Sequence, residues 1–214
     1  MDKNINKIGF YTALAAAVAS AGFSVAQILQ VAGVIAFPVD EYLIYGFSLL
    51  IPVPLIVAML ALHHTVSEEK KFLTHGALLF TVMYAGFVIL NYVVQLATVI
   101  PNELLGDAGA VSVLHQSPHS LFWDIDAIGY IFMGLAAMFA FPVFAQAGPE
   151  KWTRRFFLYN FLMTPVIAAV YFYPTFSIPL LIVGSPWLIT ATGSMFFLAR
   201  YFHGRDARTA TVSY

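Results

Sequence analysis

The sequence contains no cysteine, and only 10% of its 214 residues are charged. Without cysteine the chain forms no disulfide and offers no thiolate nucleophile and no cysteine-held zinc or iron–sulfur site. A soluble domain carries about 25% charged residues, because its surface must stay hydrated. Here 60% of the residues are hydrophobic, which is more apolar surface than one globular core can hide. Most of that surface must therefore face lipid.

Several functional motifs are also missing. No lysine lies inside a long apolar run, and the one arginine within such a run, Arg200, lies at its very end, which excludes a retinal Schiff base of the usual kind and a voltage sensor. No histidine lies in the middle of such a run, so a haem held by paired histidines is not expected. Walker, Gly-x-Ser-x-Gly and His-Glu-x-x-His motifs are absent. No cofactor is identified, and a net charge of −1 argues against a nucleic-acid partner.

Long apolar runs are the main feature that is present. A helix needs about 20 apolar residues to cross the hydrocarbon core of a bilayer. Six such runs, separated by charged residues, proline or glycine, predict a single all-α transmembrane domain over residues 1–214. The predicted spans cover approximately residues 8–37, 43–62, 73–100, 120–145, 156–173 and 178–202. The first run is about twice the length of a signal-peptide core, so we interpret it as a retained span.

The basic residues predict the orientation of the spans. Lysine and arginine resist translocation and collect on the cytoplasmic side. Six spans with a cytoplasmic amino terminus place all ten basic residues inside: Lys3, Lys7, Lys70, Lys71, Lys151, Arg154, Arg155, Arg200, Arg205 and Arg208. The outer loops then hold only acidic residues: Asp40, Glu41, Glu103 and Asp107. We therefore predict a multi-pass protein of the cytoplasmic (inner) membrane with both termini inside.

Two aspartates lie near the start of the fourth span. If this helix begins at Ser117-Pro118, Asp124 and Asp126 lie about two turns inside it. An ionisable residue at that depth usually faces the bundle interior or a water-filled cavity. Asp126 shares a helical stripe with Tyr130, whereas Asp124 points away from it. The alternative is that both aspartates lie at the level of the lipid headgroups.

Amide side chains lie at a similar depth in the third span. Asn91 and Gln95 are four residues apart and so share one helix face. Trp187 lies near the outer entry of the sixth span. The inner half of the fourth span carries no polar side chain. These positions predict a cavity that is wet toward the outside and sealed toward the cytoplasm, although interhelical hydrogen bonding alone would give the same pattern.

Histidines precede the fourth span. His115 and His119, followed by Asp124 and Asp126, offer imidazole and carboxylate groups that suit zinc or another divalent metal. The spacing of the two histidines fits a metal site only if both are helical, and His115 precedes the expected start of the helix. We therefore predict no metal site here.

The stretch from Ser120 to Tyr130, SLFWDIDAIGY, resembles the fourth span of uncharacterised bacterial membrane proteins of similar size. Those proteins carry an aspartate and a Gly-Tyr pair at this place. The resemblance implies a bacterial inner-membrane protein of six or seven helices, and it implies no chemistry.

The favoured hypothesis is a protein that binds a small or lipidic ligand in a polar cavity open to the outer half of the membrane. The candidate ligand-binding residues are Asn91, Gln95, Asp124, Asp126, Tyr130 and Trp187. One alternative is a membrane enzyme that uses Asp124 or Asp126, with His115 or His119 and a metal. Others are a small transporter and a structural accessory subunit. Membrane lipid is an expected partner, and the sequence does not indicate an oligomeric state.

Overall fold

The computed structural model describes the backbone of residues 3–211 and the side chains of residues 4–205. Two of the basic residues used to predict the orientation, Lys3 and Arg208, therefore lie outside the described side chains. Within the described residues the secondary structure is entirely helical. Six helical stretches are long and apolar enough to cross a membrane, in agreement with the predicted number of spans.

The six stretches begin and end close to the predicted limits. They are Asn4–Val31, Val39–Thr65, Glu68–Leu104, Leu121–Val143, Gly148–Phe172 and Ile178–Arg205. The helices that compose them are α1 (Lys3–Val31), α2 (Val39–Leu49), α3 (Pro52–Thr65), α4 (Lys71–Val94), α5 (Ile100–Leu104), α7 (Leu121–Ala140), α8 (Lys151–Phe172), α9 (Ile178–Gly184) and α10 (Pro186–Thr211). A four-residue helix, α6 (Ala108–Val111), lies in the loop between the third and fourth spans.

Two spans are broken by proline. Proline lacks the amide hydrogen that the helical ladder needs. The second span is therefore interrupted between α2 and α3, immediately before Pro52, and the sixth between α9 and α10, immediately before Pro186. The first span ends at Val31 rather than at the predicted Phe37, because Gly33 adopts a φ of +68° that turns the chain out of the helix.

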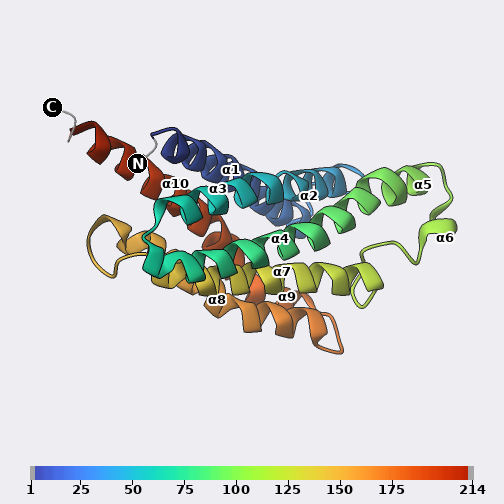
Figure 1. Cartoon of the computed structure of the whole chain (residues 1–214). Coiled ribbons are helices and arrows are strands. Elements are labelled where there is room, and N and C mark those ends of the chain that lie inside the picture. The colour runs from blue at the N-terminus through green and yellow to red at the C-terminus, as the bar shows by residue number, and fades with distance from the viewer. Residues whose placement is uncertain (1–2, 212–214) are drawn as a thin grey trace.

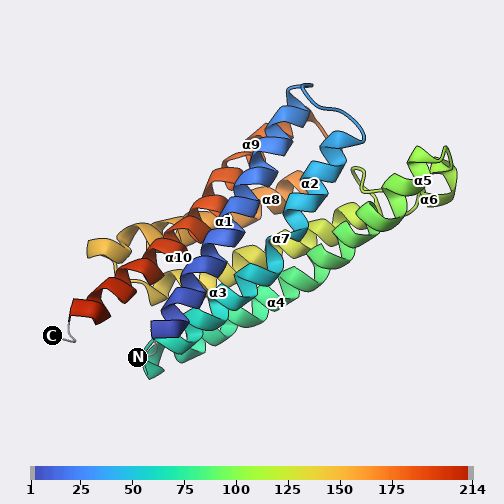
Figure 2. The same ribbon diagram turned by 90° about the horizontal axis from the view of Figure 1, so that it is seen from above.

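The spans lie side by side in one elongated bundle, and the start of α1 and the end of α10 are at the same end of it (Figures 1 and 2). Described basic side chains tie the segments at this end together. Lys70 donates to the carbonyl of Val143, and Arg205 donates to the carbonyl of Thr65. Helices α5 and α6 lie at the opposite end, which we call the distal end (Figure 2). Successive spans therefore run in opposite directions along the bundle, as six consecutive spans with both termini at one end require.

The interior of the bundle is rich in small residues. Ala13, Ala16, Ala58 and Ala191 have no exposed surface, so neighbouring helices approach closely. Large apolar side chains such as Val18, Leu79 and Ile189 are more than half exposed on the outside, where a soluble protein would carry charge. A second and much smaller cavity, of about 20 Å³, lies between α3, α4, α7, α8 and α10, next to Asn160. That volume holds about one water molecule.

Candidate functional site

Asp126 is the centre of a buried polar network in the distal half of the bundle. Its side chain is 2% exposed and lies on the buried face of α7. Asn91 Nδ2 and the Tyr92 hydroxyl donate to Asp126 Oδ1, at 3.2 and 2.8 Å. Gln116 Nε2 and the Tyr171 hydroxyl donate to Oδ2, at 3.0 and 2.6 Å. A carboxylate has about four lone-pair sites, so donors from three parts of the chain meet its full accepting capacity.

The donors are themselves held in place by further hydrogen bonds. Asn91 Nδ2 also donates to Gln116 Oε1 at 3.0 Å, and the hydroxyls of Tyr92 and Tyr130 lie 2.6 Å apart. Trp123 Nε1 donates to the backbone carbonyl of Tyr171 at 3.1 Å. Networks of this kind rigidify a site, because each member orients the next.

Gln95 fixes the loop that supplies Gln116. Its Nε2 donates to the carbonyl of Leu114 at 2.8 Å, and its Oε1 accepts from the backbone N–H of Gln116 at 3.1 Å. Gln95 begins a π-helical turn, Gln95–Val99, at the end of α4. Such turns occur as isolated bulges inside α-helices, frequently at functional sites. The loop before α7 is therefore anchored in the bundle by Gln95, which is 0% exposed.

A cavity of about 590 Å³ opens beside this network. Its lining comes from the distal end of α1, from α2, from Tyr92 of α4, from the loop before α7, from the distal halves of α7 and α8 and the loop after α8, and from α9 and the start of α10. Aromatic side chains form much of the wall. Tyr130 packs edge-on against Trp187 with ring centroids 4.6 Å apart, and Trp123 packs against Tyr171 at 4.4 Å. A size of 300–1,000 Å³ and mainly apolar walls are typical of ligand pockets.

The charges in this lining have one sign. Asp126 and Glu41 line the cavity, together with the amides of Gln27, Gln30 and Gln116, and none of the described lysines and arginines does. Gln27 donates to Gln30 at 2.8 Å, and Gln30 donates to Asp40 at 2.9 Å. The polar side of the cavity therefore presents acidic and amide groups to whatever enters it.

The chain matches no family model, no curated protein and no solved structure.

The sequence-predicted site residues fall into three groups. Asp126, Tyr130 and Trp187 line the cavity. Asn91 and Gln95 are fully buried behind it, where Asn91 donates to Asp126 and Gln95 holds the loop before α7. Asp124 is exposed on the outside of α7 and is not among the lining residues. Ligand binding by these residues stays a prediction.

The sequence did not identify three of the side chains that donate hydrogen bonds to Asp126: Tyr92, Gln116 and Tyr171. Tyr92 is next to Asn91, but on an isolated helix the two side chains point about 100° apart. Gln116 lies in the loop before the fourth span, and nothing in the local sequence shows that this loop folds back onto α4. Tyr171 lies in an aromatic stretch that also fits the interfacial belt of a span. The large number of tyrosines, 11 in the chain, was the one signal that could have pointed to hydroxyl donors.

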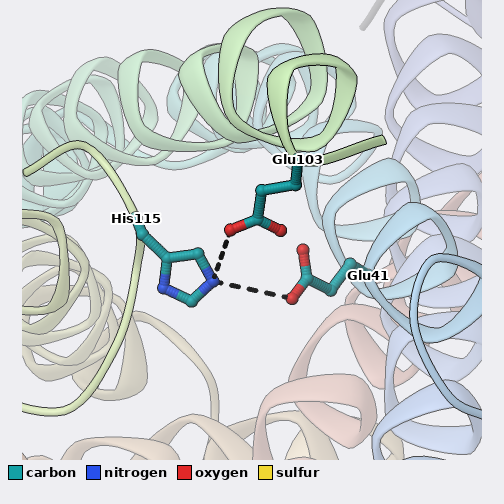
Figure 3. Close-up of side chains that lie close together, drawn as sticks. All are labelled: Glu41, Glu103 and His115. Carbon is teal, nitrogen blue, oxygen red and sulfur yellow. Dashed lines mark ion pairs between the residues drawn. The ribbon is translucent and has the colours of Figure 1, made fainter. Parts of the chain in front are cut away.

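The structure brings His115 close to Glu41 and Glu103, two residues that the metal site considered from the sequence did not include. His115 Nε2 lies 3.5 Å from Glu103 Oε1 and 3.9 Å from Glu41 Oε1 (Figure 3). His119 is exposed, with a φ of +67°. The expected placement of Asp40, Glu41 and Glu103 in outer loops also changes. Asp40 and Glu41 belong to the first turn of α2, and Glu103 belongs to α5, because both helices extend beyond the apolar runs.

Proposed function

We propose that this chain is a multi-pass inner-membrane protein that binds a small or lipidic ligand in the distal cavity, with both termini in the cytoplasm. The observation that carries the proposal is the combination of a 590 Å³ aromatic-walled cavity with a rigid polar wall centred on Asp126. A side chain that served only to hold helices together would not need to border an open volume. The second cavity, of about 20 Å³, has room for about one water molecule and is too small for such a ligand, which supports binding in the distal cavity.

The lining favours one class of ligand. Because Asp126 and Glu41 are the charged groups on the wall, an anionic head group would meet like charge in a medium of low dielectric constant. A hydroxyl, amide or ammonium head group would instead donate to the carboxylates and glutamine oxygens, while an apolar tail would contact the tryptophans and leucines. The proposed ligand is therefore a neutral or cationic amphiphile.

Tryptophan fluorescence provides the test. Trp123 and Trp187 line the cavity, whereas Trp152 lies at the opposite end at the start of α8. Three brominated probes of one chain length, an amine, an alcohol and a carboxylic acid, are added to protein in nanodiscs of unbrominated lipid. We expect saturable quenching, with the amine binding about tenfold more tightly than the acid, which corresponds to about 1.4 kcal/mol.

Two neighbouring positions provide the matched control. Ile182 and Val183 are similarly exposed on α9, at 58% and 59%, but only Ile182 lines the cavity. In this cysteine-free chain, Ile182→Cys coupled to a bulky thiol reagent should abolish saturable quenching, and Val183→Cys treated in the same way should not. Equal quenching by all three probes, unchanged by either modification, would refute the proposed function.

The proposed orientation has its own test. A cytoplasm-only reporter fused to either terminus should give signal, because all ten basic residues then remain on the inner side. An epitope tag inserted in the loop between Asn102 and Ser117 should be labelled in intact cells. Labelling of that loop only in broken cells would reverse the orientation and would place the cavity on the cytoplasmic side.

A further inference from the structure

Three ligating side chains converge at the distal end of the bundle, although they are far apart in the sequence. Glu41 comes from the first turn of α2, Glu103 from α5, and His115 from the loop before α7. One nitrogen of His115 and one oxygen of each glutamate all lie within 4.8 Å of one another. Figure 3 shows the two carboxylates and the imidazole turned toward a common centre.

The negative charge at this centre lacks a fixed cation. Glu41 follows Asp40 and lies near Glu103, while the lysines and arginines whose side chains are described belong to segments at the other end of the bundle. The side chains of Glu41 and Glu103 are only 16% and 20% exposed. Moreover, Oε2 of Glu41 is buried and has no hydrogen-bond partner among the described residues. A buried carboxylate oxygen without a donor is costly, unless a cation satisfies it.

We propose that Glu41, Glu103 and His115 bind a divalent first-row transition-metal cation such as Zn²⁺. Zinc binds imidazole nitrogen and carboxylate oxygen at about 2.0–2.2 Å, so its tetrahedral ligands lie roughly 3.3–3.5 Å apart. The 3.5 Å between His115 Nε2 and Glu103 Oε1 already lies in that range, and the 3.9 Å between His115 Nε2 and Glu41 Oε1 needs only a small contraction to reach it. The imidazole ligand favours zinc and similar ions over Mg²⁺ and Ca²⁺, which prefer oxygen.

This site does not depend on the ligand-binding proposal, but it adjoins the same cavity through Glu41. Three protein ligands leave one position of a tetrahedral ion for water or another small donor. The ion would also neutralise the charges of both glutamates and leave Asp126 as the uncompensated acidic group of the cavity wall. In addition, it would join the outer ends of the second and third spans to the connecting loop.

Metal counting tests the proposal directly. The full chain, purified on a tag without histidine and stripped with a chelator, is titrated with ZnCl₂ in the presence of excess Mg²⁺. We expect one zinc ion per chain at this site by elemental mass spectrometry, and Co²⁺ should give the visible absorption bands of a bound ion. His115→Asn should weaken zinc binding by at least about tenfold, since weaker outer-shell changes already cost 10–100-fold.

Two controls separate this site from other histidines. His119→Asn changes an exposed histidine in the same loop and keeps a residue that tolerates the positive φ. His75→Asn changes a histidine beside His63 at the other end of the bundle. Neither should alter zinc binding at the distal site. Should His115→Asn fail to fold, Glu103→Gln removes one charge and one ligand while keeping the side-chain shape.

Two results would overturn the proposal. One is equal zinc uptake by the wild-type chain and by both ligand variants, which would leave His115 as a simple ion-pair partner of the glutamates. The other is displacement of zinc by equimolar Mg²⁺, which would indicate a nonselective acidic patch. Loss of zinc binding in His115→Asn with intact quenching by the brominated amine would support the metal site and leave the cavity proposal standing.

Discussion

Asp126→Asn is expected to lower the free energy of unfolding by about 3 kcal/mol and to abolish saturable binding of the brominated amine. The amide nitrogen would replace one of two oxygens that each accept two hydrogen bonds, so donors would face donors in a buried site. A buried polar group left without a partner costs about 1–3 kcal/mol. Unfolding in a graded series of detergent mixtures, followed by tryptophan fluorescence, measures the change.

The matched control is Asp124→Asn, two residues earlier on the same helix. Asp124 is exposed, so its substitution should change the unfolding free energy by no more than about 0.5 kcal/mol. Asp40 is a poor control for this purpose, because its side chain is 7% exposed and accepts from Gln30. Equal small effects of Asp126→Asn and Asp124→Asn would show that the network contributes little to the fold or to binding.

Gly134→Ala is expected to destabilise the protein by about 1–3 kcal/mol through a steric clash between α7 and α8. A Cβ atom at residue 134 would lie 2.8 Å from Cβ of Thr164 and closer still to its hydroxyl oxygen. Real Cβ atoms do not approach so closely, so the two helices must separate, and overpacking of this kind has a cost of that size. Thermal unfolding in one detergent gives the comparison.

Gly86→Ala provides the control for backbone effects. Gly86 lies within α4, is exposed, and has open space where a Cβ would be added. Alanine favours helix over glycine by about 1 kcal/mol, so Gly86→Ala should be neutral or stabilising. If both variants unfold at the wild-type temperature, α7 and α8 do not pack in close contact at Gly134.

The number of long apolar helices and their approximate limits were predictable from sequence, because hydropathy and helix length are local properties. The residue pair Asn91 and Asp126 was also predictable to a useful degree. Both are polar in apolar helices at a similar depth, and the structure places them 3.2 Å apart. Predicting that they meet required only the antiparallel course of neighbouring spans, which short loops impose.

The cavity wall and the cluster of Glu41, Glu103 and His115 were not predictable in the same way. Asn91 and Gln95 share a helix face, yet that face points toward other helices rather than into the cavity, since rotation of a span is set by its neighbours. His115 pairs with Glu41 across 74 residues because the loop after α5 folds back over the bundle. Loop conformation depends on contacts such as that of Gln95 with Leu114, which no local pattern reveals.

Part of the cavity rim is made of Ile28, Val31 and Ile182, three apolar side chains that are about half exposed on the outer surface of the bundle. If the chain spans a bilayer as proposed, that surface faces acyl chains, and the proposed ligand would enter sideways from the membrane without passing through water. Occupancy of the cavity would then follow the mole fraction of the ligand among the lipids rather than its concentration in water. Lengthening an acyl tail by one methylene, worth about 0.8 kcal/mol in partitioning, should tighten apparent affinity in water while leaving the affinity per lipid nearly constant.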